Sequence, residues 1–171
     1  ALAEGQTVLG IQGQLWSENT RNDVIAEHKI YPRLLALAEL AWHLPQWAVP
    51  YNYQGAKYSQ ATDVFTDDMQ KLRDENWRVF ANVIGQKELP KLELASVDYR
   101  LPTVGAVIEE GMLKANVAFP GLSIEYQVNN DNVGEQPWHV YSAPVKVSGE
   151  VQVRSRSVNG LRSGRITKVV Y

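Results

Sequence analysis

A tryptophan and a carboxylate lie two residues apart near the start of this 171-residue chain, at Trp16 and Glu18. An aromatic face packs on the apolar face of a pyranose, and a carboxylate accepts hydrogen bonds from sugar hydroxyls. The pair is therefore typical of one wall of a sugar subsite. The alternative is that Trp16 covers a hydrophobic core and Glu18 is a loop charge, and the spacing alone does not separate the two.

Two further charged residues, Arg33 and Glu39, lie in the otherwise apolar stretch 30–43. Charged groups in such a stretch are expected to be buried and paired, which is usually a structural arrangement. The functional alternative is that the pair supports Glu18 from behind.

The remaining candidates are weaker. The three histidines, His28, His43 and His139, are far apart and lack the spacing of metal ligands, so we expect no metal site. Trp138 and the nearby Tyr141 form either a sugar platform or, in the favoured interpretation, a packing contact. No glycine-rich phosphate loop, serine elbow or zinc-helix motif is present, and nothing implies a cofactor.

Composition excludes several classes of function. The 44% hydrophobic and 21% charged content is that of an ordinary globular protein. The net charge of −2 gives no reason to expect nucleic-acid binding. The absence of cysteine excludes thiol catalysis and disulfides, and no apolar run is long enough to predict a membrane span.

The first half of the chain alternates between strand and helix patterns. Residues 7–16 resemble a strand that is apolar on both sides, as in a parallel sheet. Residues 17–29 are polar and turn-like. The stretch 30–43 predicts a helix with Pro32 in its first turn and Pro45 after its end. Because apolar residues cover most of its circumference, we expect this helix to be buried on most sides.

A loop is expected over 44–62, where aromatics occur without periodicity. A second helix is predicted from Thr66, which is a good N-cap, to Gly85, which we interpret as a C-terminal stop. Residues 88–94 contain Pro90 and several charges and are interpreted as a linker.

The second half shows period-two alternation, which is typical of strands. Val151 and Val153 share one face, and polar residues occupy the other. Asn159-Gly160 signals a hairpin, and residues 129–132 form a turn cluster. The spacing of these signals predicts a small antiparallel sandwich.

The chain resembles bacterial β-N-acetylhexosaminidases of glycoside hydrolase family 20, most closely the chitobiases. Five stretches carry the resemblance: Gln14–Glu18; Tyr31–Arg33 with Ala38–Glu39 and Trp42–His43; Phe80–Asn82 with Gly85–Gln86 and Glu88–Leu89; Tyr99–Pro102 with Gly121–Tyr126; and Gly149–Ser155. They span nearly the whole chain in the family's order.

The resemblance implies an α+β fragment. Residues 1–62 would supply the last strand–helix unit of a (β/α)8 barrel, and residues 63–95 an extra helix and linker. Residues 96–171 would form an all-β, immunoglobulin-like sandwich. A full barrel needs about 250 residues, so most of it would lie outside this sequence.

The resemblance also implies an exo-hydrolase that removes non-reducing-end N-acetylglucosamine from chitooligosaccharides by substrate-assisted retaining catalysis, an exception to the two-carboxylate scheme. The catalytic Asp–Glu pair would lie on an earlier barrel strand, so no residue here is assigned a catalytic role and the isolated chain should be inactive. Trp16 and Glu18 correspond to the family's Trp-x-Glu, which contacts the sugar, and Arg33 and Glu39 would support the site.

Implied partners are chitobiose and related oligosaccharides, and the rest of the barrel. The exposed barrel helix would also favour self-association. The family resemblance implies a periplasmic, outer-membrane-associated or secreted bacterial protein. The alternative function is a non-catalytic carbohydrate-binding or interdomain-support module, suggested by Trp138, Tyr141 and Tyr126.

Overall fold

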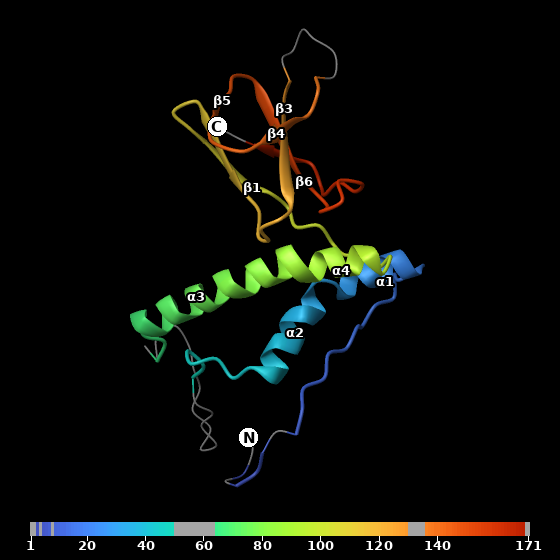
Figure 1. The fold of residues 1–171 in the computed structure, drawn as a ribbon, viewed down its shortest axis with the longest axis vertical. Coiled ribbons are helices and arrows are strands. Elements are labelled where there is room, and N and C mark those ends of the chain that lie inside the picture. The colour runs from blue at the N-terminus through green and yellow to red at the C-terminus, as the bar shows by residue number, and fades with distance from the viewer. Residues whose placement is uncertain (1–2, 4, 8, 50–63, 130–135, 170–171) are drawn as a thin grey trace.

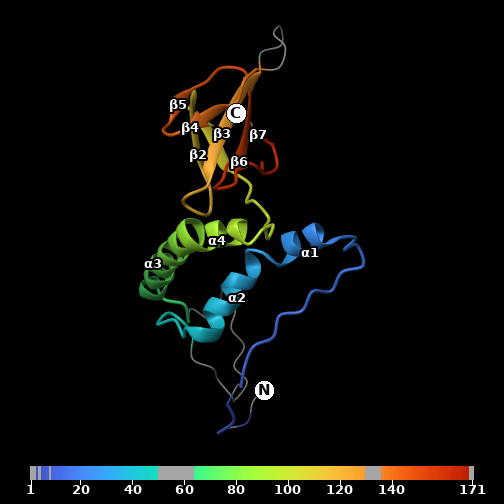
Figure 2. The same cartoon turned by 45° about the vertical axis from the view of Figure 1, so that its right-hand side comes forward.

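The computed structural model describes residues 3, 5–7, 9–49, 64–129 and 136–169. Figure 1 shows a β-domain at one end, a long helix crossing beneath it, and the N-terminal segment at the far end. The same order is visible in the turned view of Figure 2. The predicted loop 44–62 and turn cluster 129–132 fall mostly on residues outside the described ranges.

The β-domain is built from two antiparallel sheets. One has the order β1-β2-β5 and the other the order β4-β3-β6-β7. The strands are β1 Gly105–Glu109, β2 Met112–Asn116, β3 Ser123–Asn129, β4 His139–Tyr141, β5 Val145–Lys146, β6 Glu150–Arg156 and β7 Thr167–Val169. The longest pairing joins β3 and β6, with Ser123 opposite Arg156 and Asn129 opposite Glu150. The predicted antiparallel β architecture is confirmed.

A core shared by both sheets explains the period-two pattern. Leu113 comes from the first sheet, Val151 and Val153 come from the second, and all three are fully buried. Ile108 and Ile124 join the same cluster. Each Å² of buried apolar surface contributes about 25 cal/mol to the free energy of folding. This cluster is therefore the main stabilising element of the domain.

Two turns close the edges of these sheets. Glu110 and Gly111, both with positive φ, connect β1 to β2 as a two-residue hairpin turn. A turn is also found at the predicted Asn159-Gly160, where Gly160 has a φ of 72°. The connection from β6 to β7 is longer than a tight hairpin and runs from residue 157 to 166.

The helical half begins with α1 Asp23–Ile30, in the range predicted to be turn-like. The side chain of Asn22 accepts a hydrogen bond from the Ile25 N–H and caps this helix. The prediction of a turn was wrong because α1 lacks an amphipathic stripe, so only its polar cap signalled a helix.

The predicted helix 30–43 is present as α2 Arg33–Trp42, and Pro32 is its N-cap. None of its residues is buried, and Trp42 is 93% exposed. The expected burial on most sides is therefore not found. The described residues simply do not provide enough surface to cover a helix that is apolar nearly all round.

The second predicted helix starts as expected but does not stop at Gly85. Thr66 accepts a hydrogen bond from Met69 N–H and caps α3 Asp67–Val83. A π-helical turn, η2 Ile84–Glu88, and α4 Leu89–Leu94 then continue the helix through the predicted linker. Pro90 fits because it lies in the first turn of α4, where its missing N–H costs nothing.

Gly85 does not end the helix but allows close packing against the β-domain. A Cβ at this position would collide with the backbone carbonyl of Pro120 in the β-domain, and one at Gly121 would lie 2.9 Å from the Gly85 oxygen. The two backbones therefore approach each other directly. Gly85 and Pro120 directly follow two members of a second core cluster, Ile84 and Phe119. This cluster joins the helices to the β-domain and consists of Ala81, Ile84, Leu89, Tyr99, Phe119 and Leu122.

The predicted strand 7–16 is not formed over the described residues of this range, which are extended and exposed. An inner parallel strand needs a hydrogen-bonded neighbour on each side. Among the described residues no strand pairs with it, so the strand–helix unit of a barrel is incomplete in this structure.

Candidate functional site

Trp16 and Glu18 lie at the end of the extended N-terminal segment, just before α1. Both are exposed, Trp16 by 87%. The segment runs beside α2, since a Cβ on Gly13 would lie 2.7 Å from the Leu37 side chain. Trp16 does not cover a core within the described chain. Its indole and the Glu18 carboxylate are free to contact a ligand.

Three polar side chains close to Glu18 in the chain are bonded to one another. The Lys29 ammonium on α1 donates hydrogen bonds to Ser17 Oγ and, at 3.0 Å, to Thr20 Oγ1. Thr20 Oγ1 also donates to Ser17 Oγ at 2.9 Å. The two hydroxyl residues flank Glu18 in sequence. Lys29 therefore ties both sides of the Glu18 turn to one helix.

Arg33 and Glu39 are both exposed on α2, and neither forms an ion pair with any residue that the structure describes. The expected buried pair is therefore absent, because no residue of α2 is buried and both charged side chains are exposed. Glu39 lines a largely apolar cavity of about 370 Å³ between α2 and α3. Trp16, Glu18 and Arg33 do not line this cavity, so the structure does not bring the four predicted residues together.

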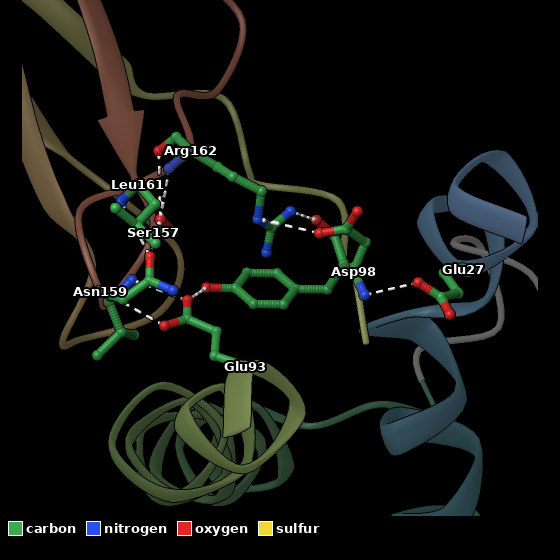
Figure 3. A network of polar contacts seen from close by, with 9 residues as sticks. Glu27, Glu93, Asp98, Ser157, Asn159, Leu161 and Arg162 are labelled. Carbon is green, nitrogen blue, oxygen red and sulfur yellow. Dashed lines mark hydrogen bonds and ion pairs between the residues drawn. The ribbon is translucent and has the colours of Figure 1, made fainter. Parts of the chain in front are cut away.

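The most developed polar site lies between the helices and the β-domain (Figure 3). The Glu93 carboxylate on α4 accepts hydrogen bonds from Tyr99 Oη at 2.5 Å and from the backbone N–H groups of Val158 and Asn159 at 3.0 and 2.9 Å. Tyr99 is fully buried. Burial raises the pKa of the Tyr99 hydroxyl well above its usual value, and the hydrogen bond to the Glu93 carboxylate raises it further.

Arg162 completes this network from the other side. Its guanidinium donates to the Tyr99 carbonyl at 2.9 Å, lies 3.1 Å from the Asp98 carboxylate and stacks 4.5 Å from the Tyr99 ring centroid. The Asp98 N–H donates to the Glu27 carboxylate on α1 at 2.6 Å (Figure 3). The segment after α4 is thus bonded to the β-domain and to α1.

No local sequence signal predicts this network. Directly bonded residues of the network lie up to 71 positions apart, as between Glu27 and Asp98. Of them, only Tyr99 belongs to the motifs that carry the family resemblance. Contacts of such separation depend on the tertiary fold and cannot be inferred from spacing.

The aromatic residues of the β-domain are engaged in protein contacts. The Arg154 guanidinium lies 4.0 Å from the centroid of the Trp138 ring and pairs with Glu125 at 2.7 Å. Arg156 approaches the other Glu125 oxygen at 3.6 Å. Tyr141 Oη accepts a hydrogen bond from the Ala115 N–H at 3.0 Å. One face of Trp138 is therefore closed to a sugar.

Two further properties concern the whole described chain. No group of three or more His, Cys, Asp or Glu residues that could hold a metal ion is found in the described ranges. Within the same ranges, no helix combines the length and apolar character that crossing a bilayer requires.

Comparison with known families gives two matches. Residues 1–45 match the catalytic domain of glycosyl hydrolase family 20, and residues 88–166 match the chitobiase/beta-hexosaminidase C-terminal domain. The second match covers most of the sandwich and the polar network around Tyr99, except for Glu27 on α1.

Curated relatives agree with these matches. The chain is 42% identical to an N,N'-diacetylchitobiase of Vibrio harveyi over 97% of its own length and 18% of the relative. It is 38% identical to a beta-hexosaminidase of Vibrio vulnificus over 95% of its length and 19% of that protein. A beta-hexosaminidase B of Pseudoalteromonas piscicida is 46% identical over 50% of the chain and 11% of the relative.

The chain thus spans less than a fifth of the two relatives that match most of its length. The predicted resemblance is confirmed by the two family matches and by these relatives, which are glycosidases. The chain belongs to the chitobiase/β-hexosaminidase family, and it carries part of a glycosyl hydrolase family 20 catalytic domain followed by the family's C-terminal domain.

Proposed function

We propose that this chain is part of an exo-β-N-acetylhexosaminidase that removes N-acetylglucosamine from the non-reducing end of chitooligosaccharides such as chitobiose. The observation that carries the proposal is the exposed Trp16-x-Glu18 pair within the residues that match the family 20 catalytic domain. The 38–42% identity to a beta-hexosaminidase and a diacetylchitobiase supports the same reaction class.

In this proposal Trp16 and Glu18 form one wall of the sugar pocket. The indole packs on the apolar face of the terminal sugar, and the carboxylate accepts hydrogen bonds from its O4 and O6 hydroxyls. Arg33 and Glu39 would support this wall once the rest of the barrel is present. These contacts select and orient the sugar but break no bond.

The bond-breaking groups are proposed to lie elsewhere in the enzyme. The reaction is substrate-assisted, with the acetamido oxygen attacking the anomeric carbon while a glutamic acid protonates the leaving oxygen and an aspartate steadies the acetamido group. The one Asp-Glu dipeptide of this sequence, Asp74-Glu75, is on the exposed surface of α3, and Asp74 pairs with Arg73. It is a solvated helix charge and not a carboxylate pair at a strand end.

The structural part of the proposal concerns the rest of the barrel. Residues 1–62 would supply its last strand–helix unit, and the β-domain would be an immunoglobulin-like sandwich. Leu34, Leu40 and Trp42 are exposed on α2, and an apolar surface of this kind requires a partner. In the whole enzyme the barrel would cover it, whereas the isolated chain should self-associate.

An activity assay tests the division of roles. The isolated 171-residue chain should not hydrolyse a chromogenic N-acetylglucosaminide, whereas the full-length enzyme should. Turnover by the isolated chain above the rate without protein would contradict the proposal that the catalytic groups lie outside it.

The substitution Glu18→Gln in the full-length enzyme tests the sugar wall. Loss of a charged hydrogen bond, worth about 1.5–3 kcal/mol, should reduce kcat/KM roughly ten- to a hundredfold. The matched control Glu75→Gln, on the exposed face of α3, should leave both constants unchanged. If Glu18→Gln behaves like the control, Glu18 is not part of the site.

A second candidate function is interdomain support by the β-domain. The polar network around Glu93, Tyr99 and Arg162 favours it over sugar binding, since Arg154 already occupies one face of Trp138. Titration of the isolated chain with millimolar chitooligosaccharide should give no NMR shifts at Trp138 or Tyr126. Shifts confined to those residues would favour a carbohydrate-binding module.

We also propose a location outside the bacterial cytoplasm, either periplasmic, outer-membrane-associated or secreted, on the basis of the family resemblance alone. Activity measured in separated cell fractions tests this part.

A further inference from the structure

We infer that the C-terminal domain positions the Glu18 segment through α1, with Glu27 and Lys29 as the two positioning residues. The inference rests on the proposed role of Glu18 in sugar binding and assigns a purpose to the contact between the two parts of the molecule.

The first step is the attachment of the β-domain to the segment after α4. Glu93 binds Tyr99 and the turn at Val158 and Asn159, while Arg162 binds the Tyr99 carbonyl and Asp98. Glu93 thus binds the hydroxyl of the buried Tyr99, and Arg162 binds its carbonyl and lies over its ring. The backbone of residues 98–99 is therefore held in one place relative to the β-domain.

The second step is the attachment of that segment to α1. The Asp98 N–H donates to the Glu27 carboxylate at 2.6 Å, and the Arg100 N–H donates to the Tyr31 carbonyl at 3.1 Å, just after the helix. A bond to an ionised acceptor is about twice as strong as a neutral one. Two adjacent anchors fix both the place and the direction of the helix.

The third step leads from α1 to Glu18. Glu27 and Lys29 are two residues apart, so they project about 200° apart around the helix. Lys29 reaches Ser17 and Thr20 on the side away from Glu27. The helix is thus a bridge, with the β-domain bound to one side and the Glu18 turn to the other.

This arrangement has a kinetic consequence. Trp16 and Glu18 are exposed on a segment without regular structure, and ordering such a segment on sugar binding costs conformational entropy. Preorganising it removes part of that cost before the sugar arrives. Lys29 therefore acts on the reaction only through Glu18.

The test is a double-mutant cycle in the full-length enzyme with a chromogenic N-acetylglucosaminide. Lys29→Met should lower kcat/KM roughly three- to tenfold, less than the ten- to hundredfold expected for Glu18→Gln, because the carboxylate is displaced but not removed. Lys29→Arg, which keeps donors for both hydroxyls, should restore most of it. In the Glu18→Gln background, Lys29→Met should cause no further loss, since coupled residues are non-additive.

A parallel pair tests the anchor on the other side of α1. Glu27→Leu should lower kcat/KM in the same way, and Glu27→Gln, which keeps an oxygen acceptor for Asp98, should restore it. If the losses of kcat/KM from Lys29→Met and Glu18→Gln multiply in the double variant, the inference is overturned. A drop in the unfolding temperature of Lys29→Met with unchanged kinetic constants would also overturn it, because that result indicates a purely structural role.

NMR relaxation of the 171-residue chain separates this inference from the proposed function. Lys29→Met and Glu27→Leu should both lower the backbone order parameters of residues 17–20, because each variant removes a bond of the bridge that holds this turn. If Glu18→Gln proves silent in the enzyme, the sugar-binding role fails while the order parameters still test the bridge. Unchanged order parameters at residues 17–20 in both variants overturn the bridge itself.

Discussion

The β-domain and the N-terminal helices differ in how far their apolar side chains are exposed to solvent. In the β-domain, Leu113, Val151 and Val153 are fully buried in a core shared by two sheets. On α2, Leu34, Leu40 and Trp42 are exposed. A region that buries its own apolar surface can fold by its own contacts, whereas one that exposes it depends on a partner. The comparison separates the self-sufficient part of this chain from the part that belongs to a larger domain.

The largest difference in the free energy of unfolding is expected between two leucine substitutions. Leu113→Ala should lower the free energy of unfolding by about 2–5 kcal/mol, because it leaves a cavity in the sandwich core. Leu44→Ala, at an exposed position after α2, should change it by no more than about 0.5 kcal/mol. Urea denaturation of both variants measures the difference. Equal effects would remove the distinction between the two regions.

A smaller effect is expected where the two regions meet. Gly85→Ala forces a Cβ against the Pro120 carbonyl, and such overpacking costs about 1–3 kcal/mol. Gly10→Ala is the control, because a Cβ there meets no described atom within 4 Å. Thermal unfolding of the two variants gives the comparison. A Gly85→Ala protein as stable as the control would mean that the helices are not tightly packed on the β-domain.

The smallest effect concerns the buried hydroxyl of Tyr99. Tyr99→Phe should cost about 1 kcal/mol at neutral pH, because Glu93 keeps its two backbone donors. Folding raises the pKa of Tyr99, so the folded chain keeps this proton at a pH where the unfolded chain, with a tyrosine pKa of about 10, has lost it. The stability difference between wild type and variant should therefore hold below about pH 10 and shrink above it.

Denaturation of Tyr99→Phe and wild type between pH 7 and 11 checks this sign. A stability gap that widens above pH 10 would show that the hydroxyl is not buried against a carboxylate.

Local patterns predicted some elements because their causes are local. Thr66 caps α3 with its own side chain, and the alternation of Val151 and Val153 follows from one buried face. Gly85 was misread as a stop because its reason, the Pro120 carbonyl, lies in another part of the chain. The strand predicted over residues 7–16 failed similarly, since pairing requires strands that the described residues do not contain.

The candidate site could also be predicted from the sequence only in part. Trp16 and Glu18 were identified from residue type and spacing, and their role in sugar binding stays a prediction. The bridge from Arg162 through Asp98 and Glu27 to Lys29 could not be predicted, because each contact joins residues that only the tertiary fold brings together.

The three hydrogen bonds to Glu93 also define where this protein can be divided. A recombinant β-domain that begins after Leu94 would lose the acceptor for Val158, Asn159 and the Tyr99 hydroxyl, leaving a buried phenol without its partner. The unit that can be transplanted between family members therefore includes α4, and a fusion joint belongs upstream of residue 88, where the match to the C-terminal domain also begins.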